Sequence, residues 1–243
     1  MLEPFYFGQY NSCFGHFSPA EGTTQGKSVL IVPSIFGEAI RAHRVTREVA
    51  KSLSKKGYDI LRFDFDGDGN SCSETSNVTV QDWIRNISDA YHELTRRSKN
   101  SSVSLLSVRF GAGLSLAALR SHPLHSVVMW DPILSNQEMY DTFIGTELNS
   151  VVNEPKYSKD PFETRLELDG MFEMGLGKDF ATGFLHINEM PLPSCDVQII
   201  GTDAYEQSQI INTTKVNYHC DWEKKDLPVI FAPKLISTIC EYF

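Results

Sequence analysis

Short apolar runs recur along this chain, and several are followed by a segment whose apolar residues are spaced three or four apart. Ser28–Ser34 reads SVLIVPS, and Asp59–Phe65 and Val103–Val108 are runs of the same kind. Continuous apolar runs of this length are typical of strands buried on both faces of a parallel sheet. Two further strands are expected at Val127–Trp130 and Val197–Ile200.

The segments between these runs predict amphipathic helices. Glu38–Lys56 has an apolar stripe at helical spacing that stops at Gly57. A second helix is expected to open at Thr79, because Asp82 three residues later completes a partial capping box. A third helix, Ala112–Arg120, follows the third strand. Strands and helices alternating in this way predict an α/β fold with a mostly parallel central sheet and helices on both faces.

The two ends of the chain are less regular than its middle. Phe5–Pro19 is rich in aromatic residues at alternating positions and is expected to form a hairpin at the edge of the sheet. Towards the other end, Val216–Tyr218 is expected to be a sixth strand and Leu227–Phe243 a closing helix.

The alternation of strands and helices fails over residues 135–193, which divides the chain into a core of residues 1–134 and 194–243 and an insertion. An insertion after a central strand is where a lid over a site is placed, and clustered glycines permit the mobility that a lid needs. The alternative is an insertion with no role at the site. The glycines and the apolar residues interleaved with them are Gly170, Met171, Phe172, Met174, Gly175, Gly177, Phe180 and Gly183.

Length, charge and cysteine content exclude several classes of protein. The 243 residues suffice for one α/β domain with a filled core. A net charge of -9 argues against nucleic-acid binding, which depends on Lys and Arg to neutralise phosphates. Five scattered cysteines suit free thiols in a reducing compartment. Met1–Ser12 carries no secretion signal and no apolar run is long enough for a membrane span, so we expect a cytoplasmic protein without cofactor or metal.

The most informative segment is Val103–Leu116, which reads VSLLSVRFGAGLSL. An apolar run, a turn of small residues and a helical pattern follow one another there, which is the layout of the nucleophile elbow G-x-S-x-G. Ser107 replaces the first glycine of that consensus, Gly111 supplies the last, and Arg109 stands at the position of the central serine. A guanidinium is permanently protonated and is no nucleophile, so Arg109 cannot form an acyl-enzyme.

Three further segments are placed as in a hydrolase. Pro33–Glu38 follows the first parallel strand, where backbone N–H groups complete an oxyanion hole. Arg62–Ser71 matches the pattern R-x-D-x-x-G-x-G-x-S. Asp203 follows a strand and His219 ends the last one, in the chain order nucleophile, acid, base.

Together these segments resemble the α/β-hydrolases over nearly the whole chain. More narrowly, the motifs P-x-x-F-G-E, V-R-F-G-A and V-V-M-W-D-P-I-L-S are similar to those of the exosortase-A-system-associated hydrolases. Those are small bacterial proteins linked to exopolysaccharide and sorting systems, and some of them also carry arginine at the elbow. The resemblance implies the α/β-hydrolase fold with a lid insertion.

Two interpretations of the altered elbow stay open. In one, Arg109 and the N–H groups of the following helix bind a carboxylate or phosphate, while His219, oriented by Asp203, activates water. In the other, the catalytic serine has been lost and Arg109 pairs with a nearby acid such as Asp203 or Glu38. Asp203 then caps a helix, and His219 merely ends a strand. Asp221, two residues beyond His219, competes with Asp203 as the acid.

Several residues around the elbow are expected to contact a ligand. Arg41, early in the first helix, is a candidate for holding an anionic group; the alternative is that it belongs with His43 and Arg44 to a solvated basic face. Ser34 and Ser107 have no evident base, so we interpret them as structural and not as displaced nucleophiles, although the Ser34 hydroxyl could donate to a ligand. The expected contact residues are Ser34, Ile35, Phe36, Arg41 and Phe110.

Two patterns that imitate metal sites are rejected. The acidic run Asp64–Asp68 resembles the start of a calcium loop, but Thr75 stands where that loop requires glutamate. We therefore expect the aspartates to bind backbone N–H groups of a turn. His122 and His125 flank a proline that breaks helical spacing, which favours a surface loop over a metal site.

Three functions remain as hypotheses. The first is hydrolysis of an acyl ester or thioester by water activation, with His219 as base, Asp203 as its partner and Arg109 as electrostatic stabiliser. The second is a catalytically silent binding or accessory protein, because this fold is reused without its chemistry. The third is an acyltransferase that uses the same pocket. Each predicts a small acyl or anionic ligand, which an acyl carrier could present.

Overall fold

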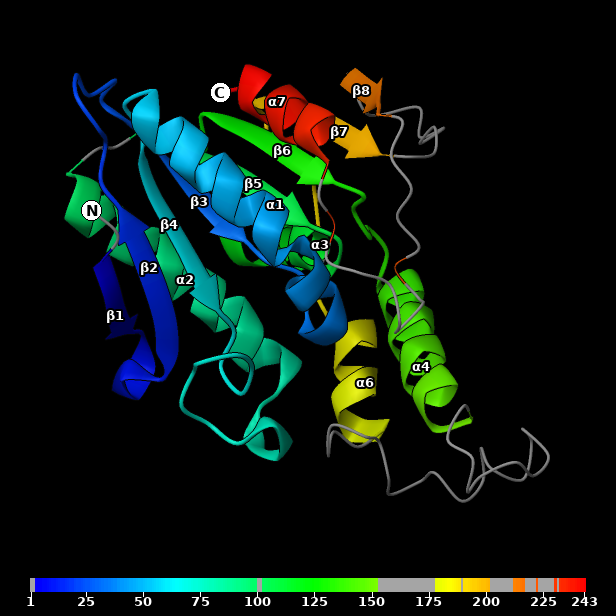
Figure 1. Cartoon of the computed structure of the whole chain (residues 1–243). Helices are drawn as coiled ribbons and strands as arrows, with labels where there is room; N and C mark the ends of the chain where they lie inside the picture. The colour runs from blue at the N-terminus through cyan, green and yellow to red at the C-terminus, as the bar shows by residue number, and fades with distance from the viewer. Residues whose placement is uncertain are drawn as a thin grey trace.

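In the computed structural model, the described residues are 3–99, 102–152, 178–188, 190–201, 212–216, 222, 230 and 232–243. They form one eight-stranded sheet in the order β1-β2-β4-β3-β5-β6-β7-β8 (Figure 1). β1 and β2 make the expected hairpin, and both the β1–β2 and the β2–β4 pairings are antiparallel. The other pairings are parallel. The strands are β1 (Glu3–Phe7), β2 (Cys13–Ser18), β3 (Lys27–Val32), β4 (Asp59–Asp64), β5 (Ser102–Val108), β6 (Ser126–Trp130), β7 (Asp196–Gly201) and β8 (Asn212–Lys215).

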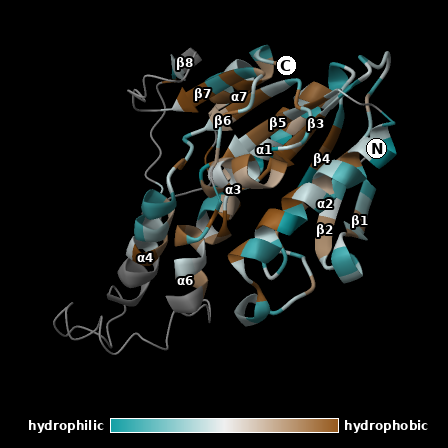
Figure 2. Cartoon of the chain, turned by 180° about the vertical axis from the view of Figure 1, so that it is seen from behind, coloured by the Kyte–Doolittle hydropathy of each residue, from teal (hydrophilic) through white to brown (hydrophobic). Residues whose placement is uncertain are grey.

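Helices cover both faces of the sheet, as the sequence predicts (Figure 1). One face packs on α1 (Phe36–Lys55) and α7 (Pro233–Glu241), and the other packs on α2 (Val80–Ser98) and α3 (Phe110–Leu119). Hydrophobic residues are concentrated along the central strands, and the helices carry them interspersed with hydrophilic ones (Figure 2). Short 3-10 helices lie at Gln9–Asn11 and Thr75–Asn77.

The predicted start of α2 is confirmed by its N-cap. The Thr79 hydroxyl accepts the backbone N–H of Asp82 at 3.2 Å, and the Asp82 carboxylate accepts the N–H of Thr79 at 2.9 Å. This reciprocal pair satisfies two N–H groups that the first turn of a helix leaves unpaired. Trp83 follows directly and is fully buried against the sheet.

The last strand and the last helix differ from the sequence prediction. β8 ends at Lys215, one residue before the segment Val216–Tyr218 that was expected to be the strand. Its sequence NTTK has no apolar run, which is why the pattern placed the strand further on. α7 begins only at Pro233, because proline favours the first turn of a helix and its ring obstructs a helix continuing from earlier residues.

The described part of the insertion consists of α4 (Asn136–Val152) and α6 (Lys178–Leu185), which pack on one another and on the core. Its contacts are aromatic: the Phe180 ring lies 4.9 Å from Trp83 and 5.5 Å from Phe143, centroid to centroid. Gly183 lets α6 approach α2, since an added Cβ would lie 3.0 Å from a methyl group of Val80. The six residues from Gly170 to Gly177 named above lie outside the described residues.

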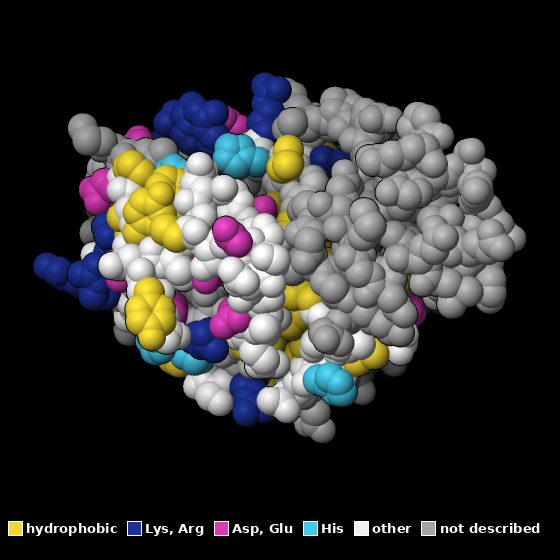
Figure 3. All heavy atoms as spheres, turned by 90° about the horizontal axis from the view of Figure 1, so that it is seen from below, with side chains coloured by type: hydrophobic (Ala, Val, Ile, Leu, Met, Phe, Trp, Pro, Cys, Tyr) yellow, Lys and Arg dark blue, Asp and Glu magenta, His cyan; other side chains and the backbone are white. Residues whose placement is uncertain are grey.

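The described surface carries no single dominant charge on the face seen from below. Basic, acidic and histidine side chains are interspersed there with apolar ones (Figure 3). Among the described helices, none is long and apolar enough to cross a membrane.

Candidate functional site

Arg109 forms the sharp turn between β5 and α3. Its backbone angles, φ of 49° and ψ of -118°, lie in a region that residues other than glycine rarely adopt. The turn is held by its neighbours, because the Arg109 N–H donates to the Trp130 carbonyl at 3.0 Å and its carbonyl accepts from Ile133 at 3.2 Å. Gly111 allows α3 to start close to the end of β3: an added Cβ there would lie 2.2 Å from the Pro33 carbonyl oxygen.

The Arg109 side chain turns towards the first turn of α1. Its Nε and Nη2 lie 3.2 Å and 3.1 Å from Glu38 Oε1, and its Nη1 lies 3.5 Å from the Asp131 carbonyl oxygen. The two side chains are 13% and 7% exposed. Of the two acids named from the sequence as partners of Arg109, Glu38 is therefore in contact with it, whereas Asp203 lies outside the described residues.

Glu38 is a buried carboxylate with a second fixed partner. Ser34 donates its hydroxyl to Glu38 Oε2 at 2.5 Å, and Ser34 is fully buried. Burial raises the pKa of Glu38, while the charge of Arg109 and the Ser34 hydrogen bond act in the opposite direction. The Ser34 hydroxyl proton is thus already donated to Glu38, so in this arrangement Ser34 cannot donate it to a ligand.

Two residues that the sequence did not single out complete the surroundings of the guanidinium. The Trp222 indole donates to Asp131 Oδ2 at 2.9 Å, and its ring centroid lies 5.4 Å from Arg109 Cζ. Asp131 follows β6 and has a φ of 43°. A polar residue at the carboxyl end of a strand next to β5 is the signal that would have indicated Asp131. Trp222 has no comparable signal, because it lies far away in the sequence.

The segment after β3 was expected to supply backbone N–H donors to an oxyanion hole, but one of these N–H groups is already bound by a carboxylate. Phe36 has a φ of 47°, and its N–H donates to Asp68 Oδ2 at 3.1 Å. Asp68 Oδ1 accepts the N–H of Gly69 at 2.8 Å, and burial raises the pKa of this carboxyl. The aspartates of this run therefore bind backbone N–H groups, as the sequence predicts.

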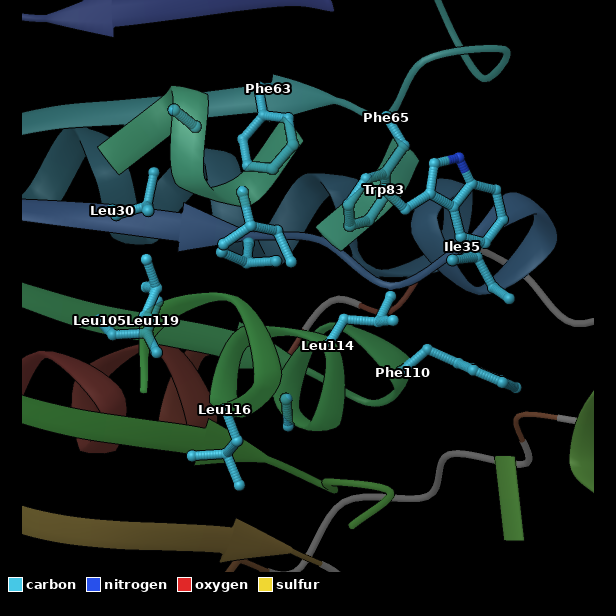
Figure 4. Close-up of a cluster of buried hydrophobic side chains, with 14 of the residues drawn as sticks. Leu30, Ile35, Phe63, Phe65, Trp83, Leu105, Phe110, Leu114, Leu116 and Leu119 are labelled. Carbon is cyan, nitrogen blue, oxygen red and sulfur yellow. The ribbon is translucent and has the colours of Figure 1, made fainter. Parts of the chain in front are cut away.

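The remaining expected contact residues are mostly buried. Ile35 and Phe110 extend the apolar cluster that contains Trp83 (Figure 4), and the Phe110 ring lies 5.6 Å from that of Phe184. Arg41 is 6% exposed, so the structure does not support its placement on a solvated face. His43 and Arg44, by contrast, are exposed.

The expected base and acid cannot be placed. Asp203, Asp221 and His219 all lie outside the described residues, and their roles stay predictions. Within the described ranges, no group of three His, Cys, Asp or Glu side chains is arranged to hold a metal ion. Ser107 is fully buried in β5, in keeping with a structural role.

Solved structures with the same fold are numerous, although their sequences are distant. An α/β serine hydrolase without lid from Xanthomonas campestris is 13% identical, with a TM-score of 0.51, over 82% of this chain and 70% of that one. An esterase from Pyrococcus furiosus is 13% identical, with a TM-score of 0.55, over 82% and 69%. Mouse α/β-hydrolase domain-containing protein 10 is 17% identical, with a TM-score of 0.50, over 83% and 77%. No protein-family model and no curated protein sequence matches the chain.

Proposed function

We propose that this chain, which has the α/β-hydrolase fold, is a binding or accessory protein that does not use acyl-enzyme chemistry. The observation that carries the proposal is the ion pair between Arg109 and buried Glu38 at the turn where the sequence pattern places a nucleophile. Arginine supplies no nucleophile. Its pairing with Glu38 also leaves little charge to stabilise an oxyanion, because the carboxylate already neutralises the guanidinium.

The loop after β3 supports the same conclusion. An oxyanion hole needs backbone N–H groups that are free when the substrate arrives. The Phe36 N–H is instead bound by the Asp68 carboxylate, which also adds negative charge where a hydrolase develops negative charge on its substrate. Ile35, Phe36 and Phe110 are apolar, so we propose that the ligand presents a small acyl group to this region, free or carried by an acyl carrier.

The backbone at Arg109 favours one alternative function. A non-glycine residue in such a conformation costs about 1–3 kcal/mol, and strain of this kind clusters at functional sites. It is compatible with direct water activation by His219, assisted by Asp203, in a protein similar to the exosortase-A-system-associated hydrolases. An acyltransferase would use the same residues with a different acceptor.

Turnover separates these functions. The purified chain is assayed with nitrophenyl esters and acyl thioesters beside Arg109→Ala and His219→Ala, and we expect no rate above buffer for any of the three. A wild-type rate that His219→Ala abolishes would overturn the proposal in favour of water activation. Transfer of the acyl group to an added alcohol or amine would instead indicate the acyltransferase.

A positive control makes the absence of turnover meaningful. Arg109→Ser restores the consensus serine, and its labelling by a fluorophosphonate would show that the rest of the site still supports a reactive serine. Arg109→Ala is the matched control and has no hydroxyl to label at this position. Thermal shift of the wild-type protein with acyl thioesters then tests binding, since a ligand that binds the folded state raises Tm.

A further inference from the structure

A groove separate from the Arg109 turn lies between α1, β2 and the end of β4. It has a volume of about 350 Å³, and neither Arg109 nor Glu38 lines it. Three basic side chains face it from three elements: His16 from β2, His43 from α1 and Arg62 from β4. The sheet brings two of them side by side, because His16 and Arg62 are direct partners in the antiparallel β2–β4 pairing.

Arg62 is the unusual member of this group. Its Nε is buried, and among the residues that the structure describes none accepts a hydrogen bond from it. The pKa of its guanidinium is lowered by burial, against the opposing effect of Asp64. A partly buried cation without a hydrogen-bonded counter-charge is costly, so natural proteins rarely keep one unless something else compensates it.

The two carboxylates that line the groove are engaged elsewhere. Asp64 Oδ2 accepts the backbone N–H of Asn70 at 3.0 Å and its side-chain amide at 3.3 Å. The carboxylate packs against Gly69, where an added Cβ would lie 2.5 Å from Oδ2. Asp68 is bound to the N–H groups of Phe36 and Gly69. Neither forms an ion pair with Arg62.

The two histidines make the groove responsive to an anion. Partial desolvation and then the positive charge of Arg62 lower the pKa of both His16 and His43, while Asp64 opposes this for both and Arg47 adds to it for His43. The lowered pKa values favour the neutral form of both rings, and Arg62 is the one Lys or Arg side chain among the residues that line the groove. An anion seated between the three side chains would offset Arg62 and raise both histidine pKa values.

We propose that this groove binds a small organic carboxylate, with its head group on the Arg62 guanidinium and its apolar part along Ile31, Phe36 and Ile40. One cation with a planar fork of donors matches a monoanionic carboxylate. The apolar lining matches a short chain, and Ile40 is 69% exposed, so this large apolar side chain is still uncovered. The groove shares Phe36 and Asp68 with the loop after β3, but neither Arg109 nor Glu38 lines it, so the proposal holds whether or not the Arg109 turn is catalytic.

Calorimetric titration with hexanoate tests the proposal, with acetate and inorganic phosphate as comparison ligands. We expect hexanoate to bind at least about tenfold more tightly than acetate, because its methylene groups leave water. Arg62→Met should weaken hexanoate binding by at least about tenfold, through loss of a charge-assisted hydrogen bond. Arg120→Met, at an exposed arginine at the end of α3, is the matched control and should bind as the wild type does.

Ring signals of His16 and His43 locate the bound ligand by NMR, and both pKa values should rise when hexanoate is added.

Arg62→Met should also raise Tm, by about 2–4 °C, because it removes a poorly compensated charge, whereas a purely structural arginine would lower Tm when replaced. Saturable binding that persists in Arg62→Met would overturn the proposal, as would no binding of hexanoate. Acetate or phosphate binding as tightly as hexanoate would overturn the assignment of the apolar lining. None of these readouts depends on turnover.

Discussion

At the scale of single residues, the pair Arg109–Glu38 decides what the candidate site is able to do. A guanidinium at the end of β5 would attract anions if it were free, but Glu38 approaches it to 3.1 Å, and both side chains are mostly buried. Ser34 holds the other oxygen of that carboxylate. The charge of Arg109 is thus neutralised by a side chain of the same protein. An anionic ligand could bind Arg109 only by replacing Glu38 as its partner.

The cost of breaking this pair is measurable. Glu38→Gln keeps the shape of the side chain but leaves Arg109 as a buried charge without its partner, so the free energy of unfolding should fall by roughly 3 kcal/mol. Urea denaturation measures the change. In the double variant with Arg109→Met most of that loss should be recovered, because neither charge remains. A double variant as unstable as Glu38→Gln alone would show that the pair is not the source of the effect.

The partly buried histidine of β2, His16, predicts how stability depends on pH. The pKa of His16 is lowered by burial and by Arg62, so its folded value lies below the ordinary 6.5. Its contribution to stability is therefore full above about pH 6.5 and is lost as pH falls through the folded pKa. Between pH 8 and pH 5, His16→Gln should lose less of its unfolding free energy than the wild type. His186→Gln, at an exposed position, is the control, and equal slopes for all three proteins would contradict the prediction.

At the scale of helices and strands, the close packing of α3 against the end of β3 requires a residue without a Cβ atom at position 111. Gly111→Ala would place a Cβ 2.2 Å from the Pro33 carbonyl oxygen, and neither backbone segment yields easily. We expect a loss of about 3 kcal/mol in unfolding free energy. Gly145→Ala in α4 is the matched control, because no atom lies within 4 Å of its added Cβ, and it should stabilise by about 0.5–1 kcal/mol. Similar effects of the two substitutions would refute this account of Gly111.

Elements were predictable from the sequence wherever burial on both faces imposed a pattern. β3, β5 and β6 are continuous apolar runs, and the sequence placed each within a residue or two of its observed ends. β8 was misplaced because its polar sequence carries no such pattern.

At the site, Glu38 could be named as a partner of Arg109 because the loop after one parallel strand meets the turn after its neighbour. Trp222 could not, since only tertiary folding brings it to Arg109.

At the scale of the whole molecule, the insertion and the core share one group of packed rings. Trp83 from the core lies 4.9 Å from Phe180 of α6, which also contacts Phe143 of α4 at 5.5 Å. Phe143 in turn lies 6.5 Å from Phe36, which opens α1 between Ser34 and Glu38. The described part of the insertion is therefore packed onto the site end of the core, and its stability is tied to that of the core.

This shared packing predicts that core and insertion unfold together. Phe180 is 7% exposed, so Phe180→Ala should lower the global free energy of unfolding by about 3–5 kcal/mol and keep a single transition when followed by Trp fluorescence and by circular dichroism. Leu185→Ala on the same helix replaces a side chain that is 37% exposed and should change stability by less than about 0.5 kcal/mol. If Phe180→Ala left the main transition unchanged, or produced a separate early one, α6 would be a locally unfolding unit. A lid that opens without disturbing the core would then be the better description of this insertion.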